Sequence, residues 1–266
     1  MVTGNFGVQM VMLKGEIEEQ GIYNTLKKVR KLGYKFIEVA NFPNIDNLME
    51  LRRVCVYLGI EVASLGTVVE PLILNESRTL LINIEKIVVD CQKLNCNLLQ
   101  IPILSPHAFI DDEAVQNFFY HVDDLAQKLL PMGITLYAQH VHRQSSMLEE
   151  LSWLNRIYNN TKYLHFGLDI PGYRQGCENL TTYSKAYEGR VAVTRIKGLD
   201  YDYSKGIDVG ATNENYHLNS ILDACTASGP KFFFIGQEEP YRNDAFTCLA
   251  LTAAKLKQLG FLNWFN

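Results

Sequence analysis

Two positively charged residues stand close together near the end of an apolar segment of this sequence. The segment VAVTRIKGLD spans residues 191–200 and places Arg195 and Lys197 two positions apart. Side chains of a β-strand alternate between its two faces, so both cations project from the same face of a strand. Because a buried charge costs several kcal/mol unless it is paired, we expect anionic or polar partners for them elsewhere in the chain.

Most of the other apolar segments carry or end in a polar residue that could supply such a partner. These residues are Gln9, Glu38, Gln100, Gln139, Asp169 and Glu238. Glu238 falls in line with Phe234 and Gly236 by strand alternation. If the segments are parallel strands closed into a cylinder, the polar residues form a ring at one end, where (β/α)8 barrels build their active sites. Two cations then face three carboxylates, which allows charge pairing.

The elements that must position this ring are eight short apolar segments, each a predicted β-strand. They are 6–10 (FGVQM), 35–40 (KFIEVA), 60–65 (IEVASL), 97–103 (NLLQIPI), 134–140 (ITLYAQH), 163–169 (YLHFGLD), 191–197 (VAVTRIK) and 231–237 (KFFFIGQ). Between them lie segments with apolar residues at i, i+3 and i+4, typical of amphipathic helices. Gly33 and Gly133 stand between a helix-like segment and a strand, where a helix end often needs positive φ. Eight strands with helical crossovers predict an α/β fold, the (β/α)8 TIM barrel.

The composition is that of an ordinary globular domain. Of the 266 residues, 47% are hydrophobic and 20% are charged, and no linker divides the chain, so we expect a single domain over residues 1–266. The net charge of −4 and the pI near 5.9 disfavour nucleic acid as a partner. The sequence has neither GxGxxG nor GxxxxGK[ST], the usual nucleotide-binding signatures.

Compartment is indicated by hydropathy and by cysteine usage. No apolar run reaches the ~18 residues of a membrane span, so we expect no membrane partner. Six scattered cysteines without a CxxC pair are typical of reduced, buried thiols. The sequence therefore predicts a cytoplasmic protein.

Six motifs, taken in order, relate the chain to a known group of barrels. They read GVQMVMLK (7–14), TLKKVRKLGYKFIEVA (25–40), GITLYAQHVH (133–142), GLDIPGYRQG (167–176), RIKGLD (195–200) and GQEEP (236–240). In this order and at these spacings the chain resembles the xylose isomerase-like TIM barrels, the sugar phosphate isomerase/epimerase group, over nearly its whole length. The resemblance implies a (β/α)8 barrel that isomerises or epimerises a sugar or sugar phosphate, with carboxylates moving a proton between carbons.

The resemblance also implies a divalent cation, commonly Mn²⁺, Mg²⁺, Co²⁺ or Zn²⁺, held at the ends of strands five to eight. The family's ligands are Glu or His, then Asp, His and Glu, and their positions fall here on Gln139, Asp169, Arg195 and Gly236. Only Asp169 is a strong ligand, because a guanidinium group keeps its protons and cannot bind a metal. Arg195 could stand in for the cation by forming a two-pronged pair with Asp169. We therefore assign no cofactor from the sequence, and the replaced ligands disfavour a divalent metal.

Three interpretations of the site follow, and the first is an isomerase or epimerase that works without the metal. In it, Lys197 binds or polarises the substrate and Arg195 stabilises a developing oxyanion. Glu38, Glu238 or Asp169 moves the proton.

The second interpretation retains a metal through neighbouring residues, namely His140, His142 and Glu238. Two histidines two positions apart place both rings on one face of a strand, although that face is opposite to the side chain of Gln139. In the third interpretation, the barrel has lost catalysis and is a non-catalytic carbohydrate-binding or regulatory protein.

All three interpretations expect the same kind of ligand, and most of the residues expected to contact it are the same. The partner is a small-molecule carbohydrate or sugar phosphate, and because barrels of this kind often pair, the expectation includes a homodimer. Tyr137, like Phe6, Phe234 and Trp264, could line a sugar pocket, but a place in the apolar core is favoured for most of these residues. The residues expected to contact the substrate are Gln9, Glu38, Gln100, Gln139, His140, His142 and His107.

Overall fold

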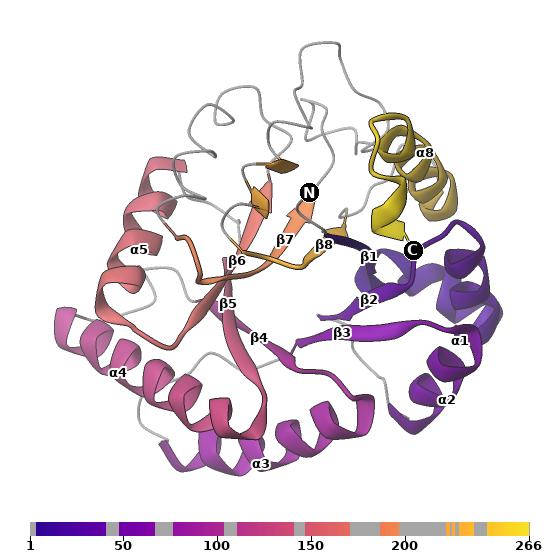
Figure 1. Cartoon of the computed structure of the whole chain (residues 1–266). Helices are drawn as coiled ribbons and strands as arrows, with labels where there is room; N and C mark the ends of the chain where they lie inside the picture. The colour runs from indigo at the N-terminus through magenta and orange to yellow at the C-terminus, as the bar shows by residue number, and fades with distance from the viewer. Residues whose placement is uncertain are drawn as a thin grey trace.

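Eight parallel strands form a closed barrel in the order of the sequence, with β8 paired to β1 (Figure 1). The computed structural model describes residues 4–40, 48–66, 77–103, 111–140, 147–170, 187–196, 222–223, 225–226, 229–236 and 244–265. The strands are β1 (Asn5–Gln9), β2 (Phe36–Val39), β3 (Glu61–Gly66), β4 (Leu98–Ile103), β5 (Thr135–His140), β6 (His165–Ile170), β7 (Val191–Ile196) and β8 (Phe232–Ile235). Each strand begins and ends within two residues of its predicted segment, and the predicted TIM barrel is confirmed.

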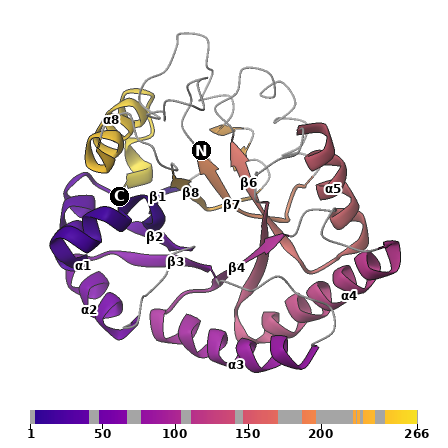
Figure 2. The same cartoon turned by 180° about the vertical axis from the view of Figure 1, so that it is seen from behind.

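Helices cover the outside of the barrel, as the views from both sides show (Figures 1 and 2). In the described part of the chain the α-helices are α1 (Lys14–Lys31), α2 (Leu48–Leu58), α3 (Ser77–Leu94), α4 (Asp112–Leu129), α5 (Met147–Asn160) and α8 (Ala245–Gln258). Short 3-10 turns lie at η1 (Met10–Leu13), η3 (Leu130–Met132) and η4 (Leu262–Phe265). Among these helices, none has the length and apolarity needed to cross a membrane.

The helix ends follow the signals in the sequence. Gly33 and Gly133 have φ of 108° and 74°, the left-handed conformation predicted for them between a helix and a strand. Asp111 begins α4 by accepting a hydrogen bond from the backbone N–H of Ala114. One face of α4 is buried against the outside of the strands, with apolar residues at helical spacing. They are Val115, Phe118, Phe119, Val122, Leu125 and Leu129.

Helix α8 begins at an acidic cap whose contribution to stability depends on pH. Asp244 accepts hydrogen bonds from the backbone N–H of Thr247 at 2.9 Å and from its hydroxyl at 2.5 Å, and these bonds lower the pKa of Asp244. We expect Asp244→Ala to lower the free energy of unfolding by about 0.5–2 kcal/mol at neutral pH. A carboxyl group with a lowered folded-state pKa stabilises the protein above its ordinary pKa and loses this effect as pH falls through the lowered value. Chemical denaturation at neutral and at strongly acid pH checks this.

The matched control for that measurement is Asp111→Ala, which removes the equivalent cap of α4. The two variants should lose comparable stability at neutral pH. A difference between wild type and Asp244→Ala that stays constant down to strongly acid pH would contradict the assigned pH dependence.

Inside the barrel, a layer of apolar side chains lies next to the layer of polar side chains that includes Gln139 and Arg195, on the side of the strands' amino ends. Tyr137 and Val193 precede Gln139 and Arg195 by two positions, so the members of each pair share a face of their strand. This order stacks a packed floor beneath the polar layer, as expected for a filled barrel rather than a pore. The buried residues of the floor are Ala63, Tyr137, Val193 and Phe234.

Two register shifts bring further side chains to the level of the polar layer. Between β2 and β3, the register changes after Ile37 and aligns Glu38 with Ser64. Between β6 and β7, a second change aligns Asp169 with Arg195. Because one extra residue in a strand turns every following side chain to the other face, these bulges decide which residues point inward.

The amino end of β7 is fixed by one arginine. Arg190 donates hydrogen bonds to the carbonyl oxygens of Leu164, Thr161 and Tyr158, at 2.6–3.1 Å. Its guanidinium also lies over the rings of Tyr158 and Phe166. These contacts join the starts of β6 and β7, the two strands that carry Asp169 and Arg195 at their other ends.

The described cysteines, which are Cys55, Cys91, Cys96, Cys225 and Cys248, are buried and form no disulfide with one another. Burial raises the pKa of Cys55 and of Cys225 to about 12, so both stay protonated and unreactive near neutral pH.

Candidate functional site

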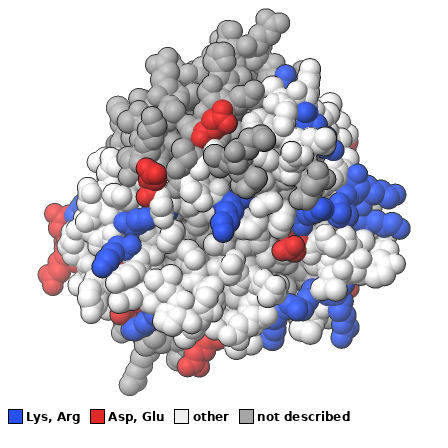
Figure 3. All heavy atoms as spheres, in the orientation of Figure 1, with Lys and Arg blue, Asp and Glu red and all other residues white. Residues whose placement is uncertain are grey.

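The ion pair between Arg195 and Glu38 differs in burial from the pairs on the surface. Figure 3 shows Lys, Arg, Asp and Glu side chains interspersed over one face of the molecule. A surface pair such as Lys128 with Asp124 is largely solvated and contributes little to stability. The side chains of Arg195 and Glu38 are only 5% and 0% exposed. Their charges are therefore only weakly screened by solvent or salt.

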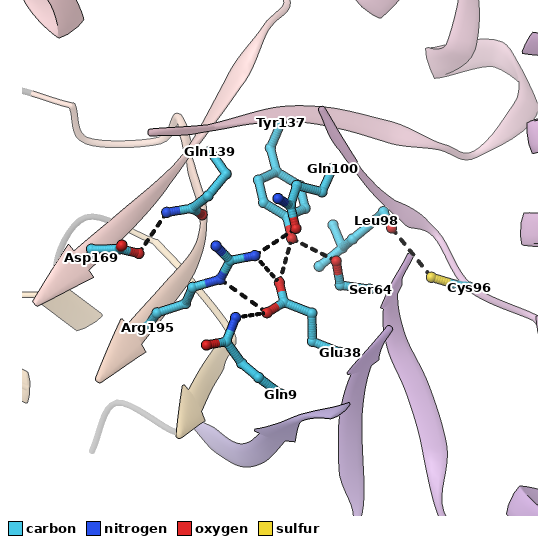
Figure 4. A network of polar contacts seen from close by, with 10 residues as sticks. All are labelled: Gln9, Glu38, Ser64, Cys96, Leu98, Gln100, Tyr137, Gln139, Asp169 and Arg195. Atoms are coloured by element: carbon cyan, nitrogen blue, oxygen red, sulfur yellow. Dashed lines mark hydrogen bonds and ion pairs between the residues drawn. The ribbon is translucent and has the colours of Figure 1, made fainter. Parts of the chain in front are cut away.

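Arg195 holds the carboxylate of Glu38 with two parallel hydrogen bonds across the barrel (Figure 4). Its Nε donates to Oε2 at 2.9 Å, and its Nη2 donates to Oε1 at 2.8 Å. Nη2 also donates to Oε1 of Gln100 at 2.5 Å. This fork geometry fixes the plane of the guanidinium and joins β7 to β2 and β4.

The carboxylate of Glu38 accepts two more hydrogen bonds. Gln9 Nε2 donates to Oε2 at 2.5 Å, and the hydroxyl of Tyr137 donates to Oε1 at 2.7 Å. The Tyr137 hydroxyl lies in turn 2.6 Å from the hydroxyl of Ser64. Four donors therefore saturate Glu38, which makes it an anchor for Arg195 rather than a base that is free to take a proton.

Burial and the ion pair set the protonation states of the cation and the phenol. Burial by itself lowers the pKa of Arg195, but the negative charge of Glu38 outweighs this effect, and the pKa lies above its ordinary value. Burial raises the pKa of Tyr137 well above its usual range, and the charge of Glu38 raises it further. Both groups therefore keep their protons and act as hydrogen-bond donors near neutral pH.

A second polar contact lies beside this network. Gln139 Nε2 donates to Oδ1 of Asp169 at 2.6 Å. The side chain of Gln139 occupies the space that a Cβ on Gly167 would need. Asp169 is partly buried, whereas Glu38, the other carboxylate in Figure 4, is completely buried.

The structure corrects one sequence-based expectation: the two-pronged pair of Arg195 forms with Glu38 and not with Asp169. Asp169 is nonetheless close enough for its charge to raise the pKa of Arg195. The correction has a geometric cause. Asp169 is aligned beside Arg195 on the neighbouring strand, whereas Glu38 on β2 faces the guanidinium from across the barrel.

The remaining sequence-predicted residues divide into two groups. Gln9, Glu38, Gln100 and Arg195 meet in one network, with Gln139 and Asp169 beside it (Figure 4). His140 ends β5, but its side chain lies outside the described part of the structure. The predicted residues that lie wholly outside the described residues are His107, His142, Lys197 and Glu238.

Two residues of the network were not predicted as part of the site. The sequence favours a core role for Tyr137 over a place in a sugar pocket, which is correct for its ring, but the hydroxyl donates to Glu38. Ser64 joins through the register shift between β2 and β3, for which the sequence gives no signal. The position of Tyr137, two residues before Gln139, is the one feature that could have indicated its role.

Removal of the Tyr137 hydroxyl should show how much its hydrogen bond to Glu38 contributes to stability. Tyr137→Phe takes one donor from Glu38 and leaves the hydroxyl of Ser64 without its partner, so we expect a loss of about 1–3 kcal/mol in the free energy of unfolding. Ser64→Ala leaves the bond between Tyr137 and Glu38 in place and should cost less. Urea denaturation of both variants measures the difference in the free energy of unfolding. Equal losses would contradict the arrangement in which Tyr137 links Ser64 to Glu38.

The described residues do not fit the divalent metal that the family resemblance implies. Gln139 turns its amide nitrogen toward Asp169, Arg195 cannot ligate, and Gly236 has no side chain. The space above Gly236 is taken by the side chain of Gln9. No group of three His, Cys, Asp or Glu residues suited to a metal is found among the described residues. The metal interpretation that uses His140, His142 and Glu238 lies outside them.

Comparison with known proteins finds solved structures that share the fold of this chain. A sugar phosphate isomerase/epimerase from Parabacteroides distasonis is 16% identical, with 97% of this chain and 100% of that chain covered and a TM-score of 0.73. A xylose isomerase domain protein from Alicyclobacillus acidocaldarius is 13% identical, with 99% of each chain covered and a TM-score of 0.70. An AP endonuclease, family 2, from Brucella melitensis is 13% identical, with 97% and 98% covered and a TM-score of 0.70.

No protein-family model matches the sequence, and no curated protein gives a significant match. At these identities the likeness to solved structures is one of fold, and it extends over almost the entire chain. The chain thus has the eight-stranded TIM-barrel fold of the sugar phosphate isomerases/epimerases and xylose isomerase-like proteins.

Proposed function

We propose that the protein is a sugar or sugar-phosphate isomerase or epimerase that works without a divalent metal. The observation that carries this proposal is the buried guanidinium of Arg195 at the carboxyl end of β7. A metal-binding histidine occupies this position in the family that the sequence resembles. A fixed positive charge in its place can perform the same electrostatic task, because it stabilises an oxygen that becomes negative during the reaction.

The reaction needs a base, a cation and a carbonyl group on the substrate. A carboxylate removes the proton from the carbon next to the carbonyl, and the electron pair of that C–H bond moves toward the carbonyl oxygen to form an enolate. Isomerisation results when the proton returns to the former carbonyl carbon and the proton of the neighbouring hydroxyl moves to the former carbonyl oxygen, so that the carbonyl changes position. Return of the proton to the other face of the same carbon gives epimerisation. Neither route changes the oxidation state of the substrate as a whole.

The described residues divide these roles by their hydrogen bonds. Glu38 is saturated by four donors, so we assign the proton transfer to Asp169, which is partly exposed and held by Gln139. The bonds from Arg195 to Glu38 and Gln100 use Nε and Nη2, which leaves Nη1 as the group that can meet a substrate oxygen. From the sequence we add Lys197 as a substrate-binding cation and Glu238 as a second proton carrier.

Exchange of carbon-bound hydrogen with D₂O tests the proposal whichever product the reaction forms. Neutral ketoses and aldoses and their phosphate esters are incubated with the protein in D₂O, with and without EDTA, and proton NMR follows loss of the C–H signal next to the carbonyl. We expect exchange in at least one sugar at a rate that EDTA leaves unchanged. Exchange that EDTA abolishes and Mn²⁺ restores would overturn the metal-independent mechanism.

One observation favours a second candidate, a non-catalytic carbohydrate-binding or regulatory barrel. Arg195 and Glu38 neutralise each other, and such a self-satisfied pair is also what a purely structural centre would contain. This candidate predicts saturable sugar binding in isothermal titration calorimetry and no C–H exchange with any sugar of the panel.

A further inference from the structure

The outer face of α2 carries apolar side chains where an amphipathic helix usually carries polar ones. On the inner face, Leu51 is buried in the core. On the outer face, Met49, Val56 and Tyr57 are 45%, 70% and 75% exposed. Helical spacing places these three residues in one row with Arg53, which is also exposed. A contiguous exposed apolar group with a polar rim is a feature of interaction sites.

Helix α1 extends this face with a second aromatic ring. Tyr23 is 37% exposed, and its ring centroid lies 5.9 Å from that of Tyr57. Lys27, one turn further along α1, places its Nζ 5.5 Å from the centroid of the Tyr23 ring. The two helices therefore form one continuous surface, which we call the α1–α2 patch. It consists of Tyr23, Lys27, Met49, Arg53, Val56 and Tyr57.

The charge of this surface is positive, although the chain as a whole is negative. Residues 22–31 contain four cations and no carboxylate, and α2 contains two arginines and one carboxylate, Glu50. In Figure 3, Lys and Arg side chains gather on the right, where Figure 1 places α1 and α2. The ion pairs between described residues do not involve Lys27 or Arg53. Both charges are therefore available to an anionic partner.

Charge and symmetry narrow the kind of partner. A two-fold dimer through this surface would place the patch against its own copy, so Lys27 and Arg53 would face like charges. An extended polyanion, such as nucleic acid or an anionic bilayer, would also meet the net charge of −4 on the chain. A short acidic segment meets the patch alone, because charges beyond about 8 Å are largely screened at physiological ionic strength. Tyr, Met and Arg are also enriched in protein–protein interfaces.

We propose that the α1–α2 patch is a docking site for an acidic segment of another protein that carries an aromatic or aliphatic anchor. The anchor packs against Tyr23, Val56 and Tyr57, and carboxylates on either side of it pair with Lys27 and Arg53. Two helix surfaces, each about 15 Å long, bury less than about 1,200 Å², an area typical of a transient complex. Because both helices lie outside the barrel, docking is independent of the reaction proposed for its interior.

Fluorescence anisotropy with a labelled peptide tests the docking site. The probe is a glutamate-rich peptide with a central pair of phenylalanines, and two reference peptides replace its glutamates by lysine or its phenylalanines by alanine. We expect the probe to bind with a Kd on the order of 10–100 µM, and more weakly as salt is raised. The alanine reference should bind at least about five-fold more weakly. Absence of saturable binding by the probe, or equal binding by the lysine reference, overturns the proposal.

Two variants with matched controls localise the binding. Lys27→Glu should weaken binding of the probe by at least about ten-fold. Lys162→Glu, which changes another exposed lysine over a tyrosine ring, that of Tyr163, should leave binding unchanged. Tyr57→Ala should weaken binding by at least about five-fold, whereas Tyr120→Ala, at a ring 69% exposed on α4, should not. Equal effects of a variant and its control would show unspecific attraction and overturn the proposal.

Two further measurements test the other possible occupants. A sedimentation coefficient that Tyr57→Ala leaves unchanged supports the proposal, whereas a dimer that Tyr57→Ala dissociates places a second copy on the patch and overturns it. Tighter binding of a DNA duplex or of phosphatidylserine vesicles than of the probe, lost in Lys27→Glu, also overturns it. Circular dichroism verifies that each variant is folded, and Arg53→Glu replaces Lys27→Glu if that variant is not.

Discussion

Arg195→Met should lower the free energy of unfolding by about 3–5 kcal/mol, because it leaves Glu38 as an uncompensated charge in the barrel. Glu38 would keep its hydrogen bonds from Gln9 and Tyr137 but lose both bonds from the guanidinium. Gln100 would also lose the donor to its Oε1. Methionine fills much of the vacated volume, so a cavity contributes little to the expected loss. Urea denaturation monitored by circular dichroism measures the change.

A double-mutant cycle separates the charge effect from general damage to the barrel. Arg195→Met/Glu38→Gln removes both charges together, and the glutamine can still accept a hydrogen bond from Tyr137. We expect the double variant to be more stable than Arg195→Met, because the stranded carboxylate is gone. Losses that simply add would show that the two side chains do not act as a pair. Lys128→Met, which breaks an exposed pair with Asp124, is the surface control and should cost less than about 1 kcal/mol.

Asp169→Asn should reduce the rate of C–H exchange by about 10²–10⁴-fold, the usual contribution of a positioned general base. The substitution is nearly isosteric, and the asparagine oxygen can still accept the hydrogen bond from Gln139 Nε2. We therefore expect the loss to fall on the rate, with little effect on the free energy of unfolding. The measurement is the NMR exchange assay at saturating sugar, with urea denaturation of the same sample.

The control for this prediction is Asp124→Asn, which removes a carboxylate from the outer helix α4. Its exchange rate should equal that of the wild type. An unchanged rate in Asp169→Asn would remove Asp169 from the proposed mechanism and move the proton transfer to Glu238, the remaining carboxylate of the predicted set.

The closed barrel could be predicted from local patterns in the sequence. Apolar runs such as VAVTRI (191–196) and FFFI (232–235) are strands because β-branched and aromatic side chains suit a pleated, buried surface. Alternation with period two also assigns Gln100, Gln139 and Arg195 to the inner face. These features depend only on residues a few positions apart, which is why the sequence determined them.

The pairing inside the barrel was decided by the tertiary structure. Arg195 and Glu38 are 157 positions apart, and no local pattern states which carboxylate a cation on β7 will meet. The choice depends on strand register, which a single bulge changes, and bulges next to Glu38 and Gly167 set the levels of Ser64 and Asp169. The sequence by itself therefore determined the eight strands and the inward faces of Gln100, Gln139 and Arg195. Only closure of the sheet decided that Glu38 saturates Arg195 while Asp169 lies beside the pair and accepts a hydrogen bond from Gln139.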